Sequence, residues 1–104
     1  MRWYHYIAYF LGGAFVANGV PHFVNGVSGH PFPSPFAHPP GAGQSSALVN
    51  VLWGFANLVI GYLLVCKVGT FELRSWRHVL LAASGALLMA VLLARAFGKL
   101  YGGL

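Results

Sequence analysis

Three apolar segments constrain the fold of this chain more than any other feature: residues 4–20, 47–65 and 79–97. None contains an acidic residue, and each approaches the roughly 20 apolar residues that a helix needs to cross a bilayer. Charged residues make up only 7% of the 104-residue chain, against about 25% in soluble domains. We therefore predict a single all-α domain over residues 1–104, a polytopic membrane protein with three transmembrane helices.

The ends of these segments carry signals for helix termination. Pro21 is predicted to stop the first helix, because proline lacks an amide proton and clashes with the preceding turn. Gly69 suits the left-handed position after the second helix, and Thr70 is a candidate cap for the third. Residues 21–46 then form one long connection between the first two helices.

The basic residues predict the orientation of the chain. A net charge of +5 would suggest nucleic acid in a soluble protein, but here the basic side chains lie at the ends of apolar segments, where they contact lipid headgroups. We therefore expect a lipid bilayer and no nucleic acid as partner. On the side of the N-terminus lie Arg2, Lys67, Arg74 and Arg77, and on the other side Arg95 and Lys99. This excess predicts a cytoplasmic N-terminus and an extracytoplasmic loop 21–46.

The connection over residues 21–46 contains all six prolines of the chain. Disordered tracts are usually polar and charged, whereas this one has no charged residue and carries several phenylalanines and valines. Proline also removes amide donors that would need partners near lipid. We therefore predict an ordered, Pro-rich extracytoplasmic cap that folds back onto the helix ends.

Three histidines of this connection, His22, His30 and His38, are spaced eight residues apart. If they converge, three imidazoles make an open metal site. No Cys, Asp or Glu stands nearby to add a ligand or to orient one. The alternative is that they are interfacial polar residues bonded to free carbonyls. The sequence leaves both open and identifies no cofactor.

Polar and small residues of the second segment share one helical face: Asn50, Trp53, Gly54, Asn57 and Gly61. Helix packing explains this face if it meets small residues of the other helices, for which the candidates are Gly13, Ala17 and Gly85. The functional interpretation makes Asn18, Asn50, Trp53 and Asn57 the floor of a ligand pocket with the Pro-rich loop as its lid. His22 and His38 would complete that site.

Residues 18–61 read NGVPHFVNGVSGHPFPSPFAHPPGAGQSSALVNVLWGFANLVIG, with the loop pattern PFPxPFAxPPG at residues 31–41. This run resembles small uncharacterised bacterial integral membrane proteins, over rather less than half of the chain. The resemblance implies a bacterial inner-membrane setting. It carries no activity and transfers no site residue.

Catalysis by paired carboxylates is excluded because Glu72 is the single acid of the chain, so the sequence favours a protein that is not an enzyme. The leading hypothesis is an accessory or assembly subunit of a membrane complex, or a homo-oligomer. The rival is a small-molecule, cofactor or metal-binding membrane protein with its site under the loop. A further alternative is an oligomeric channel with the face from Asn50 to Gly61 around its axis.

Overall fold

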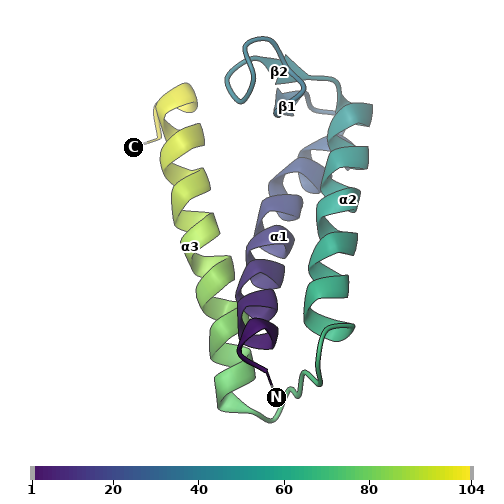
Figure 1. Cartoon of the computed structure of the whole chain (residues 1–104). Helices are drawn as coiled ribbons and strands as arrows, with labels where there is room; N and C mark the ends of the chain where they lie inside the picture. Colours follow the sequence, from purple (N-terminus) through teal and green to yellow (C-terminus); the bar gives the residue numbers. More distant parts are fainter. Residues whose placement is uncertain (1, 104) are drawn as a thin grey trace.

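The computed structural model describes residues 2–103, and three helices make up most of them (Figure 1). Helix α1 spans Trp3–Val27, α2 spans Ala47–Cys66 and α3 spans Trp76–Tyr101. All three are long and apolar enough to cross a membrane. The structure thus confirms an all-helical chain with three candidate membrane spans.

The prediction that Pro21 ends the first helix is wrong. Helix α1 continues through Pro21 to Val27, so the spans are longer than predicted and the connection begins at residue 28. The missing amide proton of Pro21 leaves the carbonyl of Ala17, one turn earlier, without its helical partner, and apolar helices tolerate such a loss where the surroundings compensate. In the next turn the side-chain amide of Asn25 adds a bond to the carbonyl oxygen of Pro21 at 2.7 Å. The helix ends where Gly29 adopts a left-handed φ of 78°.

Serine side chains cap both later helices. The hydroxyl of Ser46 accepts from the amide of Val49 at the start of α2. Helix α3 begins at Trp76, where Ser75 is the cap, so the expectation that Thr70 caps this helix is wrong. Gly69 has the left-handed φ expected of it, at 62°.

Helix α1 packs against both α2 and α3, whereas α2 and α3 scarcely touch each other (Figure 1). Glycines bring the backbones together at both contacts. A Cβ atom on Gly19 would lie 2.8 Å from the carbonyl oxygen of Gly54 in α2. A Cβ atom on Gly13 would collide with the carbonyl of Ala82, and one on Gly85 with the carbonyl of Phe10. The backbones of α2 and α3 are therefore both in contact with the backbone of α1.

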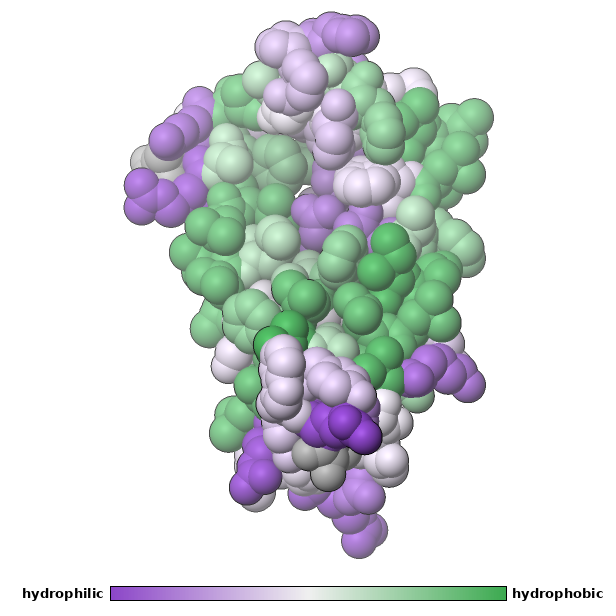
Figure 2. Space-filling model, viewed as in Figure 1, coloured by the Kyte–Doolittle hydropathy of each residue, from purple (hydrophilic) through white to green (hydrophobic). Residues whose placement is uncertain are grey.

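The polar and small face of α2 is the one that it turns toward α1. The buried residues of α2 are Asn50, Gly54, Asn57 and Gly61. Gly61 lies against Gly12 and Val16 of α1, and Ala17 of α1 is half-buried. Large hydrophobic side chains are exposed on all three helices, and only 6% of the most apolar stretch of α3 is buried. Figure 2 shows hydrophobic residues around the middle of the molecule and hydrophilic ones toward both ends.

Residues 28–46 cover one end of the helices with a small hairpin (Figure 1). Strand β1 (Phe32–Pro33) pairs antiparallel with β2 (Gln44–Ser45), with Phe32 opposite Ser45. The Ser34 and Ser45 hydroxyls are 2.5 Å apart, and the Gly41 amide donates to the Ser34 carbonyl at 2.8 Å. Ser34 and Ala37 are buried, so part of this segment packs inward.

The opposite end is held by the connection between α2 and α3. Tyr9 is fully buried there, with its ring edge-on to Phe71 at 5.0 Å between centroids. The amide of Glu72 donates to Nδ1 of the buried His78 at 3.0 Å. The N-terminus lies at this same end (Figure 1). Because Glu72 belongs to the connection between α2 and α3, it is remote from the hairpin at the other end.

Candidate functional site

A pocket of about 220 Å³ lies beneath the hairpin, between the upper halves of the three helices. Helix α1 contributes Asn18 and His22, α2 contributes Trp53, and α3 contributes an apolar wall. Its lining from the other segments is Pro33, Ser34, Pro35 and Gly41 of the hairpin, and Leu93, Ala96 and Phe97 of α3. Figure 2 shows hydrophilic atoms in a hollow between hydrophobic ridges, below the hairpin.

One chain of hydrogen bonds ends at His22. The side-chain nitrogen of Asn50 lies within hydrogen-bond distance of three carbonyl oxygens: 3.0 Å from that of Phe32, 3.2 Å from that of Ser45 and 3.0 Å from that of Ser46. A group facing three carbonyls must be the NH₂ donor. The amide oxygen of Asn50 then faces Nδ1 of His22 at 2.9 Å and must accept from it.

This chain of hydrogen bonds fixes a proton on Nδ1 of His22. Among residues 2–103 no side-chain carboxylate lies beside the ring, since Glu72 is in the connection at the other end of the molecule. A buried imidazolium with no counter-charge is unfavourable. The ring is therefore neutral, with a lone pair on Nε2. Within residues 2–103 no hydrogen bond reaches Nε2, although His22 is only 3% exposed.

A second chain ends at Asn18. The side-chain nitrogen of Asn57 donates to the carbonyl oxygen of Trp53 at 2.8 Å, which leaves its amide oxygen toward α1. Asn18 donates to that oxygen at 2.9 Å. One amide hydrogen and the amide oxygen of Asn18 are not used by this bond, and Asn18 lines the pocket. Both chains thus start at backbone carbonyls and end at the pocket.

Aromatic rings surround His22. Its ring is edge-on to Phe32, Phe97 and Trp53, at centroid distances of 5.5, 6.2 and 6.4 Å. Phe32 in turn contacts Phe97 at 4.6 Å and stacks on Tyr101 at 6.2 Å. This cluster joins the hairpin to α3 around the imidazole.

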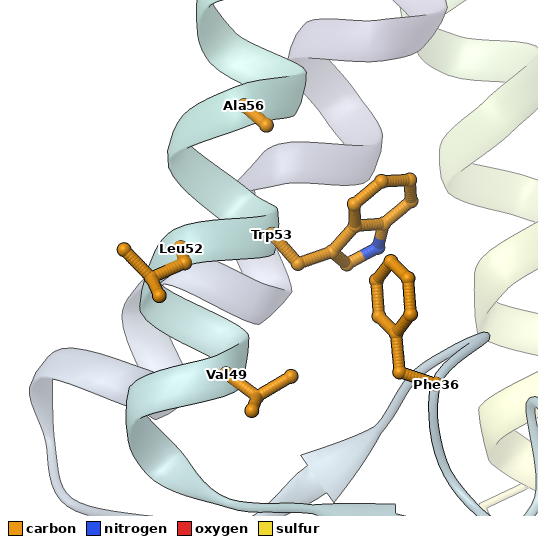
Figure 3. A pocket seen from close by; sticks show the side chains of 5 residues that line it. All are labelled: Phe36, Val49, Leu52, Trp53 and Ala56. Carbon is orange, nitrogen blue, oxygen red and sulfur yellow. The ribbon is translucent and has the colours of Figure 1, made fainter.

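Trp53 separates the polar pocket from a larger apolar groove. This groove, of about 440 Å³, is lined by Phe36, Val49, Leu52, Trp53 and Ala56. The indole nitrogen is buried and has no hydrogen-bond partner among residues 2–103. Figure 3 shows that nitrogen on the side facing Phe36, whose ring is edge-on at 5.2 Å. We take the smaller pocket as the site because the groove offers no other polar side chain.

Only some of the candidate residues of the sequence analysis lie at the pocket. Asn18, His22 and Trp53 line the pocket, whereas Asn50 and Asn57 lie behind them, 0% and 1% exposed. His30 and His38 are exposed. Within residues 2–103 no three metal-binding side chains come together, so His22, His30 and His38 do not converge.

Sequence reasoning missed the contribution of α3. Leu93, Ala96 and Phe97 form a wall of the pocket, yet the sequence marks them only as part of an apolar span. It also missed Gly12, Gly19 and Gly26, which all meet α2. Their spacing of seven residues was the available signal.

No protein-family model, curated protein or solved structure matches the chain. The case for a function therefore rests on the geometry of this pocket.

Proposed function

We propose that this protein is a multi-pass protein of the bacterial inner membrane that binds a small molecule in the pocket beneath its hairpin. The observation that carries the proposal is the pair of polar chains that end at the pocket, at Nε2 of His22 and the amide of Asn18. Both groups line the pocket and keep hydrogen-bonding capacity that no bond among residues 2–103 uses. A ligand in the pocket can pair with them.

The burial of the α2 face argues against the other candidate functions. That face motivated an accessory subunit, a homo-oligomer and a channel, but Asn50 and Asn57 are buried against α1 inside one chain. It is not free to line a pore or to meet another subunit. The exposed helical faces are apolar and are suited to lipid. Binding is favoured over catalysis because Glu72, the single acid, is remote from the pocket.

A pocket-filling substitution tests the proposed binding. Ala96 is exposed and lines the pocket, so Ala96→Phe should fill it without disturbing either polar chain. We expect native mass spectrometry of the protein, extracted in mild detergent from its host, to show 11.2 kDa plus a few hundred daltons or less. Ala96→Phe should lose the extra mass.

The control for this substitution is Ala94→Phe, since Ala94 is exposed on the same helix and lines no pocket described above. It should keep the extra mass. A bare chain from the host, or extra mass that persists in Ala96→Phe, contradicts the proposal. An added mass of tens of kilodaltons would favour the accessory-subunit hypothesis instead.

The proposed orientation puts the hairpin outside the cell and the N-terminus in the cytoplasm. Its support is the excess of basic residues at the end that holds the N-terminus and the connection between α2 and α3. Because Ala42 and Leu73 are exposed at opposite ends, we expect Ala42→Cys, in a Cys66→Ser background, to react with an impermeant maleimide on intact cells. Leu73→Cys should react only after permeabilisation, and the reverse pattern would invert the topology.

A further inference from the structure

The chemistry of the pocket narrows the class of ligand, and this inference rests on the binding function proposed above. Its volume of about 220 Å³ exceeds the roughly 150 Å³ of an apolar protein cavity that accommodates benzene. It is below the lower end of drug-sized sites, at about 300 Å³. The pocket therefore suits one substituted six-membered ring.

Charged ligands are unsuited to this pocket. No residue of its lining is acidic or basic, apart from the imidazole of His22, whose Nδ1 proton is held by the amide oxygen of Asn50. A buried carboxylate or ammonium group of a ligand would have no counter-charge. A metal ion is equally unsuited, because His22 is the single strong metal ligand in the lining.

The polar groups of the pocket match one hydroxyl group. Nε2 of His22 is an acceptor and needs a donor from the ligand. Asn18 keeps one amide hydrogen that the bond to Asn57 does not use, and this hydrogen can donate to the same ligand oxygen. A sugar, with many hydroxyls, would leave most of them unpaired against the apolar wall.

The remaining lining favours an aromatic ring over an aliphatic one. Trp53 and Phe97 contribute aromatic rings to the lining, and Pro33 and Pro35 contribute rigid apolar rings. Aromatic pairs in edge-to-face arrangements gain about 0.5–1.5 kcal/mol beyond area burial. We propose that the pocket binds a neutral phenolic ring, whose O–H donates to Nε2 of His22 and whose oxygen accepts from Asn18.

Ligand-side comparisons test the proposal without any mutation. We would titrate ¹⁵N-labelled protein in micelles with phenol and follow the ring nitrogens of His22 by NMR. Phenol should shift the Nε2 resonance saturably. Anisole keeps the ring and the oxygen but lacks the donor, so it should bind about tenfold more weakly and leave the Nε2 resonance in place. Cyclohexanol should bind severalfold more weakly than phenol.

Equal affinities for phenol and anisole, or an Nε2 resonance that phenol does not move, overturn the assignment of His22 as acceptor. Equal affinities for phenol and cyclohexanol overturn the preference for an aromatic ring. If phenol fails while the protein from its host still carries a small mass that Ala96→Phe removes, the ligand class is wrong and the binding function stands.

A matched pair of variants supports the same test. His22→Phe removes Nε2 and keeps a ring, so it should abolish the difference between phenol and anisole. His78→Phe makes the same change at the other buried histidine, at the opposite end of the helices. It should leave the difference unchanged, and loss of the difference in both variants would contradict a specific role for His22.

Discussion

Adding one methyl group at Gly13 or Gly85 is expected to lower the free energy of unfolding by about 1–3 kcal/mol. Both glycines lie where α1 meets α3, and the new Cβ would collide with a backbone carbonyl, of Ala82 in the first case and Phe10 in the second. Backbone cannot rotate away as a side chain can, so the helices must separate. Alanine also favours a helix by about 1 kcal/mol over glycine, so a net loss would identify the packing effect.

Thermal denaturation in detergent, followed by near-ultraviolet circular dichroism, measures this loss. Gly12→Ala is a graded comparison, because its Cβ would first meet a side-chain methyl group of Val65 at 2.5 Å, with the nearest backbone atom at 3.1 Å; we expect a smaller effect. Gly103→Ala is the control, since its Cβ would have its nearest neighbour at 3.9 Å. A midpoint for Gly13→Ala or Gly85→Ala at or above that of Gly103→Ala would show that α3 is not held against α1 in this way.

Apolar length and helical spacing were enough to predict the three helices and the inward face of α2. Both depend on sums over many residues, so single errors do not change them. The end of α1 could not be predicted in the same way. A proline removes one hydrogen bond from a helix but does not have to end it. Here the helix continues to Val27, and the side chain of Asn25 adds a bond in the turn that follows Pro21.

The pocket was predicted in outline but not in its connections. The sequence predicted one site under the loop, and three of its residues line the pocket: Asn18, His22 and Trp53. The other three do not, since Asn50 and Asn57 lie behind the lining and His38 is exposed. Spacing alone does not say that Asn57 pairs with Asn18 and Asn50 with His22. That pairing depends on the relative shift of two helices, which the glycine contacts set.

Spacing alone also could not distinguish the three histidines. His22, His30 and His38 look alike in sequence, with equal spacing. Only His22 lies within a helix, and it is 3% exposed, while His30 and His38 lie in the exposed part of residues 28–46. The continuation of α1 past Pro21 makes this difference, because it carries His22 into the contact with α2.

Replacement of Asn50 by Leu is expected to cost about 2–5 kcal/mol of unfolding free energy and to loosen the hairpin. The amide of Asn50 is 0% exposed and joins the carbonyls of Phe32 and Ser45 to His22. Leucine would leave these buried groups without partners, and each such group costs about 1–3 kcal/mol. Hydrogen exchange over residues 32–46 should accelerate, because the link between the hairpin and α2 is lost.

Two further variants separate the parts of this effect. Asn50→Asp keeps an acceptor for Nδ1 of His22 but loses the donors to Phe32 and Ser45, so the hairpin should loosen as in Asn50→Leu while His22 keeps its proton on Nδ1. Asn57→Leu removes the bonds to Asn18 and to the carbonyl of Trp53, neither of which involves the hairpin, at nearly the same burial and on the same helix. It should leave exchange in the hairpin unchanged. Equal exchange in Asn50→Leu and Asn57→Leu would mean that Asn50 does not hold the hairpin. The carbonyls of the hairpin would then not orient the amide of Asn50, and Nε2 of His22 would lose its role as the fixed acceptor of the pocket.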